Sequence, residues 1–205
     1  MYFVTGRLAD SMPQEKLRQW NEERETWLLV HGLASTAQLA TLPEQKQREF
    51  HSRFTRQWHD WLDAGYGECL LRRSEIRQLF LNRLHGHEEA DGELDAWVAM
   101  PNHFHAAVTP AAATLGELVK QWKGGSAFDI NQALQRRGAL WQTEPYDHIV
   151  RSAAQWRHYR RYIAENPIKA KLREGEYAVG LGKVVWASAQ SLLKHFQKEE
   201  EAAAE

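Results

Sequence analysis

The sequence predicts an α+β fold in which helices pack against an antiparallel sheet. Two short apolar segments, residues 94–100 and 103–109, are separated only by Pro101 and Asn102, and so short a connection joins antiparallel neighbours. Apolar residues at helical spacing flank this pair on both sides. The chain has 205 residues, of which 43% are hydrophobic and 26% charged, enough for one core or for one core with an appended helical piece.

The first predicted element is a strand over residues 2–8, YFVTGRL, whose β-branched and aromatic side chains show rough alternation. From Pro13 onward the chain is rich in charge, and its apolar residues recur at helical spacing. These residues are Leu17, Trp20, Trp27, Leu28, Phe50, Phe54, Trp58 and Trp61. Gly32 and Pro43 interrupt the pattern, so we expect two or more amphipathic helices in an insertion over residues 13–63.

One helix is expected before the two predicted strands and one after them. Ser74 is a candidate N-cap for a helix that ends near His85. A second helix fits residues 114–134, where Gly124 and Gly125 are expected to bend or break it.

The C-terminal part of the chain predicts a short strand near residues 148–150 and two further helices. Ser152 caps a helix that runs to about Glu165, because the residue before Pro167 avoids helical geometry. The tail over residues 184–205 favours helix by propensity, with a frayed acidic end.

Taken in order, these elements fit one domain over residues 1–205, with a ferredoxin-like antiparallel sheet, packed helices and a helical insertion after the first strand. The single Cys69 excludes an internal disulfide and a cysteine-rich zinc site. No apolar run approaches the roughly 18 residues of a membrane span, and the N-terminus has no basic segment followed by an apolar one. We therefore expect no membrane span, no secretory signal and a reducing, cytoplasmic location.

The net charge of −1 hides an uneven distribution along the chain. Residues 120–173 carry 11 Lys and Arg against 4 Asp and Glu, whereas the remainder carries 15 against 23. A basic segment of this kind is typical of polyanion binding, and equally of a solvated basic helix face.

His103, Phe104 and His105 lie on the second strand of the predicted pair. Because alternate residues of a strand point to one face, the two imidazoles project together and Phe104 packs on the other side. Two imidazoles on one face can hold a divalent cation if a third ligand comes from elsewhere. The alternative is a pair of surface or cross-strand-paired histidines.

Tyr162 and Asn166 lie four residues apart on a predicted helix and so share a face, with Tyr159 within reach of the same stripe. A phenol that attacks a phosphodiester needs lowered proton affinity and a cation on the scissile phosphate, which a metal on the two histidines would supply. The alternative for either tyrosine is an aromatic residue of the core or its boundary.

Cations and aromatic residues interleave from the second helix to the end of the tyrosine helix. This pattern suits a single strand or hairpin of nucleic acid, since phosphates pair with cations and unstacked bases lie on aromatic rings. The candidate cations are Lys120, Lys123, Arg151, Arg157, Arg160, Arg161 and Lys169. The aromatic residues include Trp122 and Trp141, for which the alternative is a place in the core, the favoured interpretation for Trp141.

The segment MPNHFHAAV, residues 100–108, looks like the HUH-motif strand of the single-tyrosine HUH transposases, and YRRYIAENPIKAKL, residues 159–172, resembles their tyrosine helix. The opening YFVTGRLADS and the segment WQTEPYDHIVR, residues 141–151, are also similar to the branch known as REP-associated tyrosine transposases. The resemblance covers residues 2–10 and roughly 66–177, with four motifs in the right order.

The resemblance implies a nuclease and strand transferase that acts on single-stranded DNA with hairpins through a 5′-phosphotyrosine intermediate. His103 and His105 would be the paired metal ligands, Tyr162 the nucleophile and Asn166 the third ligand, a position at which the family often has Gln, Glu or Asn. Tyr159 has the wrong offset from Asn166 for the family pattern, so it is interpreted as a supporting aromatic residue.

The resemblance also implies Mg²⁺ or Mn²⁺ as the metal cofactor, although imidazole ligands by themselves would bind Zn²⁺ more tightly. It favours a monomer over a dimer and a nucleoid-associated location in a bacterial cytoplasm. Two other functions stay open, a domesticated hairpin-binding protein without turnover and a metal-binding domain unrelated to nucleic acid. The insertion over residues 13–63 is not part of the minimal family core, and contacts to DNA or to another copy are both open for it.

Overall fold

The computed structural model of the protein describes residues 1–55, 61, 65–86, 90–143 and 146–203. Trp58 and residues 62–63 of the expected insertion, and residues 204–205 of the expected tail, lie outside the described residues. The chain divides into two compact units, one formed by Met1–Ala9 and Glu68–Glu205 and the other by Asp10–Gly67. No helix in the described part of the chain has the length and apolar character needed to cross a membrane.

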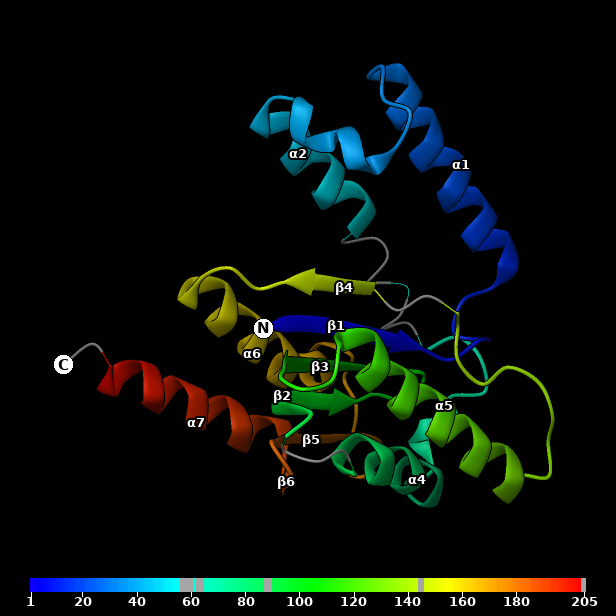
Figure 1. Ribbon diagram of the computed structural model, residues 1–205, viewed down its shortest axis with the longest axis vertical. Coiled ribbons are helices and arrows are strands. Elements are labelled where there is room, and N and C mark those ends of the chain that lie inside the picture. Colours follow the sequence, from blue (N-terminus) through cyan, green and yellow to red (C-terminus); the bar gives the residue numbers. More distant parts are fainter. Residues whose placement is uncertain (56–60, 62–64, 87–89, 144–145, 204–205) are drawn as a thin grey trace. The chain divides into compact units, whose positions relative to one another are not determined.

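The first unit is a sheet covered by helices (Figure 1). Its strands are β1 (Tyr2–Arg7), β2 (Gly92–Ala99), β3 (His103–Pro110), β4 (Tyr146–Ile149), β5 (Ala178–Leu181) and β6 (Val184–Trp186). Its helices are η3 (Leu70–Arg72), α4 (Ser74–His85), α5 (Leu115–Ala133), α6 (Ala153–Lys169) and α7 (Ala189–Ala202). The six strands lie in the order β4-β1-β3-β2-β5-β6, and each neighbouring pair is antiparallel.

The order β4-β1-β3-β2, with α4 between β1 and β2 and α5 between β3 and β4, is the split βαβ arrangement of a ferredoxin-like sheet. The predicted fold class is therefore confirmed. Strands β5 and β6 extend the sheet beyond β2 and were not predicted. They span only four and three residues, too few to show a clear alternation, and Val184 and Val185 of β6 are exposed.

Each face of the sheet has its own apolar core. Val4, Trp97 and Phe104 pack in one cluster with residues of α4 and α5. Phe3 and Val98 pack in the other with residues of α6 and α7. The cluster on the α4 and α5 side also contains two tryptophans, Trp122 and Trp141, so both are core residues and not exposed platforms for bases.

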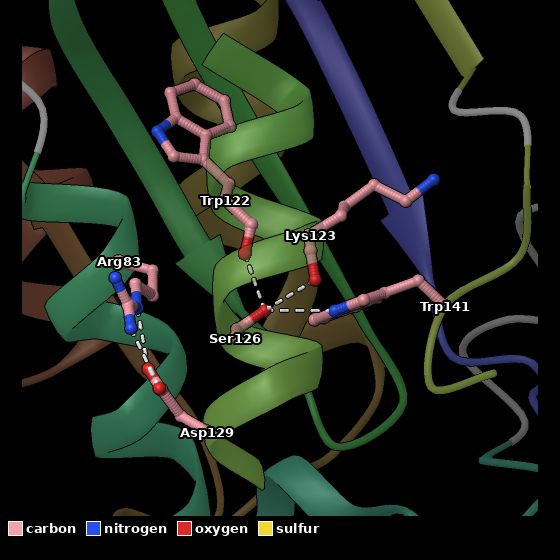
Figure 2. Close-up of polar contacts among 6 residues, drawn as sticks. All are labelled: Arg83, Trp122, Lys123, Ser126, Asp129 and Trp141. Atoms are coloured by element: carbon pink, nitrogen blue, oxygen red, sulfur yellow. Dashed lines mark hydrogen bonds and ion pairs between the residues drawn. The ribbon is translucent and has the colours of Figure 1, made fainter. Parts of the chain in front are cut away.

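Helix α5 runs unbroken through Gly124 and Gly125, so a break at these glycines is wrong. A Cβ atom at Gly125 would lie 2.8 Å from Cδ of Arg83 on α4, which shows that the glycine makes room for a side chain of the neighbouring helix. Arg83 donates two hydrogen bonds of 2.6 and 2.8 Å to Asp129 of α5 (Figure 2). Packing between the two helices therefore outweighs the low helix propensity of glycine.

Helix α6 continues past Pro167 to Lys169, so the expected end near Glu165 is also wrong. A proline ring removes one backbone donor, a small loss this close to the helix end. The turn after it is closed by Leu172 N, which donates to Pro167 O at 3.0 Å. At the start of α4, Arg73 and not Ser74 is the N-cap, and no side chain caps it.

The expected helical tail over residues 184–205 begins with strand β6, and its helix, α7, starts only at Ala189. Ser188 caps α7 by accepting a hydrogen bond from Ser191 N at 3.1 Å. Helix α7 is helical to Ala202, so Glu199, Glu200 and Glu201 of the acidic end belong to it, and its Leu192 and Phe196 are buried in the core.

The second unit is built from the helices α1 (Gln14–Val30), η1 (Thr36–Thr41), α2 (Glu44–Phe50) and η2 (His51–Thr55). They enclose a core of their own around Trp27 and Phe54. The two ends of the unit meet, since a Cβ atom at Gly67 would lie 2.6 Å from the carbonyl oxygen of Asp10.

Candidate active site

Strand β3 places His103 and His105 side by side on one face of the sheet. Their ring centroids are 4.8 Å apart, and both side chains are 0% exposed. Phe104 between them packs on the opposite face, where its ring lies 4.8 Å from that of Phe80. The burial rules out a pair of surface histidines.

Hydrogen bonds at the Nδ1 atoms hold both imidazoles in place. His103 Nδ1 lies 2.8 Å from Oδ1 of Asn102, and because an amide oxygen only accepts, Nδ1 carries the proton and Nε2 presents a lone pair. His105 Nδ1 lies 2.8 Å from Oγ1 of Thr5, its register partner on β1. A hydrogen bond at Nδ1 that leaves Nε2 basic is typical of histidines that bind metals.

Helix α6 brings Tyr162 to this face. The Tyr162 ring centroid lies 5.2 Å from that of His105 and 5.7 Å from that of Phe3, edge-on to both. Phe3 in turn stacks on His105 at 5.2 Å. The ammonium of Lys169 lies 5.7 Å from the Tyr162 centroid. The phenol therefore stands at the margin of the core, half-buried, between a buried imidazole and a cation.

The second tyrosine of the helix has different neighbours. Tyr159 stacks on Phe3 with centroids 4.2 Å apart and lies 5.7 Å from His148 of β4. Its place in the aromatic cluster agrees with the interpretation as a supporting residue.

Asn166 follows Tyr162 by one helical turn and is 1% exposed. Neither Oδ1 nor Nδ2 of its amide has a hydrogen-bond partner among the residues that the structure describes. A buried amide without partners costs free energy unless a ligand satisfies it. The described residues contain no group of three His, Cys, Asp or Glu side chains suited to a metal, so a metal on the histidine pair would need a ligand of another type, such as this amide.

Five of the seven candidate DNA-binding cations are exposed, namely Lys120, Arg151, Arg157, Arg161 and Lys169. Two of these five form ion pairs within the protein. Arg161 donates to Glu200 of α7 at 2.5 and 3.0 Å, and Lys169 lies 2.7 Å from Glu165. Exposed pairs of this kind are weak and screened by salt, so a phosphate can compete for both cations.

Arg160 is buried, which contradicts an exposed role in DNA binding. Its guanidinium lies between the rings of Trp156 and Phe196, 4.5 and 4.2 Å from their centroids, and pairs with Asp95 at 3.4 Å and Glu199 at 2.7 Å. Trp156 Nε1 donates to Asp95 at 2.7 Å, while burial raises the pKa of Asp95. Arg160 thus ties together β2, α6 and α7.

Lys123 is also buried, and its ammonium donates to the carbonyl oxygens of Gln142 at 2.5 Å and Thr143 at 3.1 Å. Burial lowers the pKa of Lys123, and the nearby charge of Arg7 lowers it further. The ammonium is thus held by backbone carbonyls, while part of the side chain lines a hollow on α5.

A hollow of about 310 Å³ opens beside the tyrosine on the outer side of α6. Its walls carry mostly basic side chains together with Tyr162 and one carboxylate. The lining residues are Ala154, Arg157, His158, Arg161, Tyr162, Glu165 and Lys169. A negatively charged ligand therefore meets favourable charge next to the phenol.

Three residues of the site were not anticipated from the sequence. Thr5 and Asn102 hold the histidines, and Arg7 is the register partner of His103 across the β1–β3 pair. Burial lowers the pKa of Arg7 to about 10. Asn102 stands next to His103 in the sequence and could have been proposed as its partner, whereas Thr5 and Arg7 depend on the strand register.

No family model matches the chain, and no curated protein matches it. A solved structure similar to it is that of a REP-associated tyrosine transposase bound to a REP hairpin. The TM-score is 0.40 and the sequence identity 16%, over 82% of this chain and 66% of that chain. The match thus spans just under two thirds of the other protein, and a TM-score at this level does not establish a common function.

Proposed function

We propose that the protein nicks and rejoins single-stranded DNA at hairpins, with Tyr162 as the nucleophile. The observation that carries this proposal is the position of the Tyr162 ring, 5.2 Å from that of His105 on the face that holds both histidines. Cleavage of a phosphodiester requires a nucleophile and positive charge near the phosphate. The phenol of Tyr162 would be the nucleophile, and the basic walls together with a cation on the two imidazoles would supply the charge.

The residues at the site fit a divalent metal ion. His103 presents the Nε2 lone pair, His105 has its Nδ1 engaged by Thr5, and the buried amide of Asn166 has no described hydrogen-bond partner. These three residues would hold the Mg²⁺ or Mn²⁺ that the resemblance implies, with the amide of Asn166 as an oxygen ligand beside the two imidazoles. When bound, such an ion offsets the negative charge that develops on the scissile phosphate.

Tyr162 supplies the covalent chemistry. Its Oη loses a proton and forms a bond to phosphorus, while the bond between phosphorus and the 3′ oxygen breaks and that oxygen takes up a proton. The products are a 5′-phosphotyrosine and a free 3′-hydroxyl. The Lys169 ammonium lies 5.7 Å from the centre of the Tyr162 ring and would pair with the phosphate that the phenol attacks.

The phosphotyrosine ester also permits rejoining. One phosphodiester is exchanged for another, so a second 3′-hydroxyl can attack the phosphotyrosine and displace Tyr162. The exposed cations Lys120, Arg151 and Arg157 would hold the DNA backbone.

A covalent trapping assay tests the proposal. The protein is mixed with labelled single-stranded hairpins taken from the DNA beside its gene, with Mn²⁺ or with EDTA, and run on a denaturing gel. We expect a metal-dependent adduct that disappears in Tyr162→Phe and persists in Tyr159→Phe, which keeps the stacking on Phe3. An adduct lost only in Tyr159→Phe would refute the assignment of Tyr162.

Absence of an adduct has a separate meaning in the same experiment. If no adduct forms but a native gel shows a mobility shift that weakens steeply with salt, the protein binds hairpins without turnover. If neither signal appears with any flanking hairpin, the proposal of a DNA-processing enzyme is wrong.

A further inference from the structure

A hollow of about 470 Å³ lies along the first half of α5, apart from the groups assigned to the chemistry. It is lined by residues of α5 between Leu115 and Gly124 and by Thr143. Two of these lining residues are lysines, and none of the described lining residues is acidic. The hollow therefore combines the positive charge of Lys120 and Lys123 with the apolar side chains of Leu115 and Val119. Such a surface suits an anionic ligand that also has an apolar part.

Two glycines inside α5 keep this hollow open. A glycine within a helix destabilises it relative to alanine, so its presence calls for a reason. Gly125 has one, because a Cβ atom there would meet Arg83. A Cβ atom at Gly124 would meet no heavy atom within 4 Å, and one at Gly116 would meet only Thr114 Oγ1 at 4.0 Å. The protein's own packing thus explains neither glycine, whereas close approach by a ligand backbone would explain both.

Lys123 supplies a buried charge at the floor of the hollow. It is 9% exposed, and its ammonium donates to the carbonyl oxygens of Gln142 and Thr143. An ammonium has three N–H groups, so one remains to donate to a ligand oxygen. Burial lowers the pKa of Lys123 and the nearby charge of Arg7 lowers it further, so an anion close to both cations would be stabilised. Lys120, one turn before Gly124, adds an exposed cation at the rim.

Phe128 adds an aromatic surface next to the hollow. It follows Gly124 by one turn, so both lie on the same stripe of α5, and its side chain is 67% exposed. An exposed phenylalanine beside lysines matches a ligand that offers phosphates and flat bases in alternation.

We infer that the α5 hollow is a second DNA-binding site, where the sugar-phosphate backbone of the hairpin substrate passes over Gly116 and Gly124, pairs with Lys120 and Lys123, and stacks one unpaired base on Phe128. This inference rests on the proposed function for the identity of the ligand as DNA. It adds a site that anchors the substrate and takes no part in the chemistry at Tyr162.

Binding measurements on the full chain without metal test the inference. The probes are the fluorescein-labelled flanking hairpin, with its single-stranded ends, and oligo(dT), both followed by fluorescence anisotropy. Gly124→Leu fills the hollow, and we expect it to weaken binding at least tenfold. Phe128→Ala removes one stacking surface and should weaken binding about tenfold. Lys120→Gln should reduce the slope of log K against log salt by about 0.7 to 0.9.

Matched controls separate these effects from general damage. Lys194→Gln removes a charge from an exposed position on α7, and Val184→Ala trims a side chain that is 64% exposed on β6. Both should leave affinity unchanged. Gly124→Leu should melt no lower than the wild type, because leucine is a better helix former than glycine and enters open space.

The outcomes distinguish this site from the proposed catalysis. If the α5 variants bind DNA like the wild type while the Tyr162 adduct still forms, the inference is overturned and the proposed function stands. If they lose binding in a protein that forms no adduct, the site is supported and the catalytic proposal fails. A wild type that binds neither probe overturns both.

Discussion

Replacing Gly6 with alanine should disturb the histidine face although it adds only one methyl group. Gly6 pairs across β1 and β3 with Phe104, the residue between the two histidines. An added Cβ atom would lie 2.6 Å from Cζ of Phe104 and nearer still to Cε1, whereas carbon atoms in contact are about 3.5–4.0 Å apart. The Phe104 ring is buried, with centroids 4.8 Å from Phe80 and 5.4 Å from Trp141, so it has little room to move aside.

The size of the effect follows from two opposing contributions. Overpacking of a filled core costs about 1–3 kcal/mol, while a glycine-to-alanine change recovers about 0.4–1 kcal/mol by restricting the unfolded chain. We expect the free energy of unfolding of Gly6→Ala to fall by about 1–2 kcal/mol. For a chain of this length that corresponds to a drop of about 2–8 °C in melting temperature.

Urea unfolding followed by circular dichroism measures this change, with Gly124→Ala as the matched control. The control adds the same methyl group to an exposed helix position with no neighbour within 4 Å, so its free energy of unfolding should rise by about 0.5–1 kcal/mol. Adding Phe104→Leu to Gly6→Ala should cost less than the sum of the two single changes, because the smaller side chain relieves the clash. Equal free energies of unfolding for Gly6→Ala and Gly124→Ala would refute the argument that the space around each glycine decides whether an added methyl group stabilises or destabilises the protein.

Three further predictions concern single hydrogen bonds and charges. In the core, Trp141 Nε1 donates to Ser126 Oγ at 3.0 Å (Figure 2). Ser126→Ala removes this acceptor and should lower the free energy of unfolding, measured by urea titration, by about 1–3 kcal/mol. An unchanged urea midpoint would contradict this prediction. Burial raises the pKa of Asp95 in the folded protein, so the folded state binds more protons there than the unfolded chain, and stability falls as the pH rises from about 4 through the folded pKa. The Asp95→Asn variant should not lose stability in this way. Urea unfolding of both proteins at several pH values from about 4 upward measures the difference. Parallel curves of stability against pH for the two proteins would contradict the prediction. In Asn102→Leu the Nδ1 proton of His103 loses its acceptor, so Mn²⁺ binding measured by calorimetry should weaken about 10–100-fold. An unchanged affinity for Mn²⁺ would argue against His103 as a metal ligand.

The arrangement of the histidines was within reach of the sequence, because alternation along a strand is a local property. Two residues separated by one position on β3 must share a face, whatever the rest of the fold does. The partners of the histidines were not predictable in the same way. Thr5 reaches His105 only because β1 pairs with β3 in one particular register, and that register is decided by the packing of both faces over the whole sheet.

Local signals failed where packing between elements decides the structure. Glycine and proline predicted a break at Gly124 and an end before Pro167, yet both helices continue because buried side chains along them hold them against the sheet. Arg160 is one of several cations on α6, and only the three-dimensional structure shows that Asp95 and Glu199 enclose it. A count of basic residues therefore overestimates the surface open to DNA.

The meeting of Asp10 with Gly67 bears on how the chain could have acquired its helical unit. A segment whose two ends touch replaces a tight turn, so the residues before and after it need not move to accommodate it. The entropy needed to close a loop grows only with the logarithm of its length, which makes even a long addition at such a point inexpensive. The stretch from Asp10 to Gly67 can thus be exchanged or shortened in evolution while β1 and η3 keep their places, and the junction is equally a site where a tag or foreign domain can be grafted.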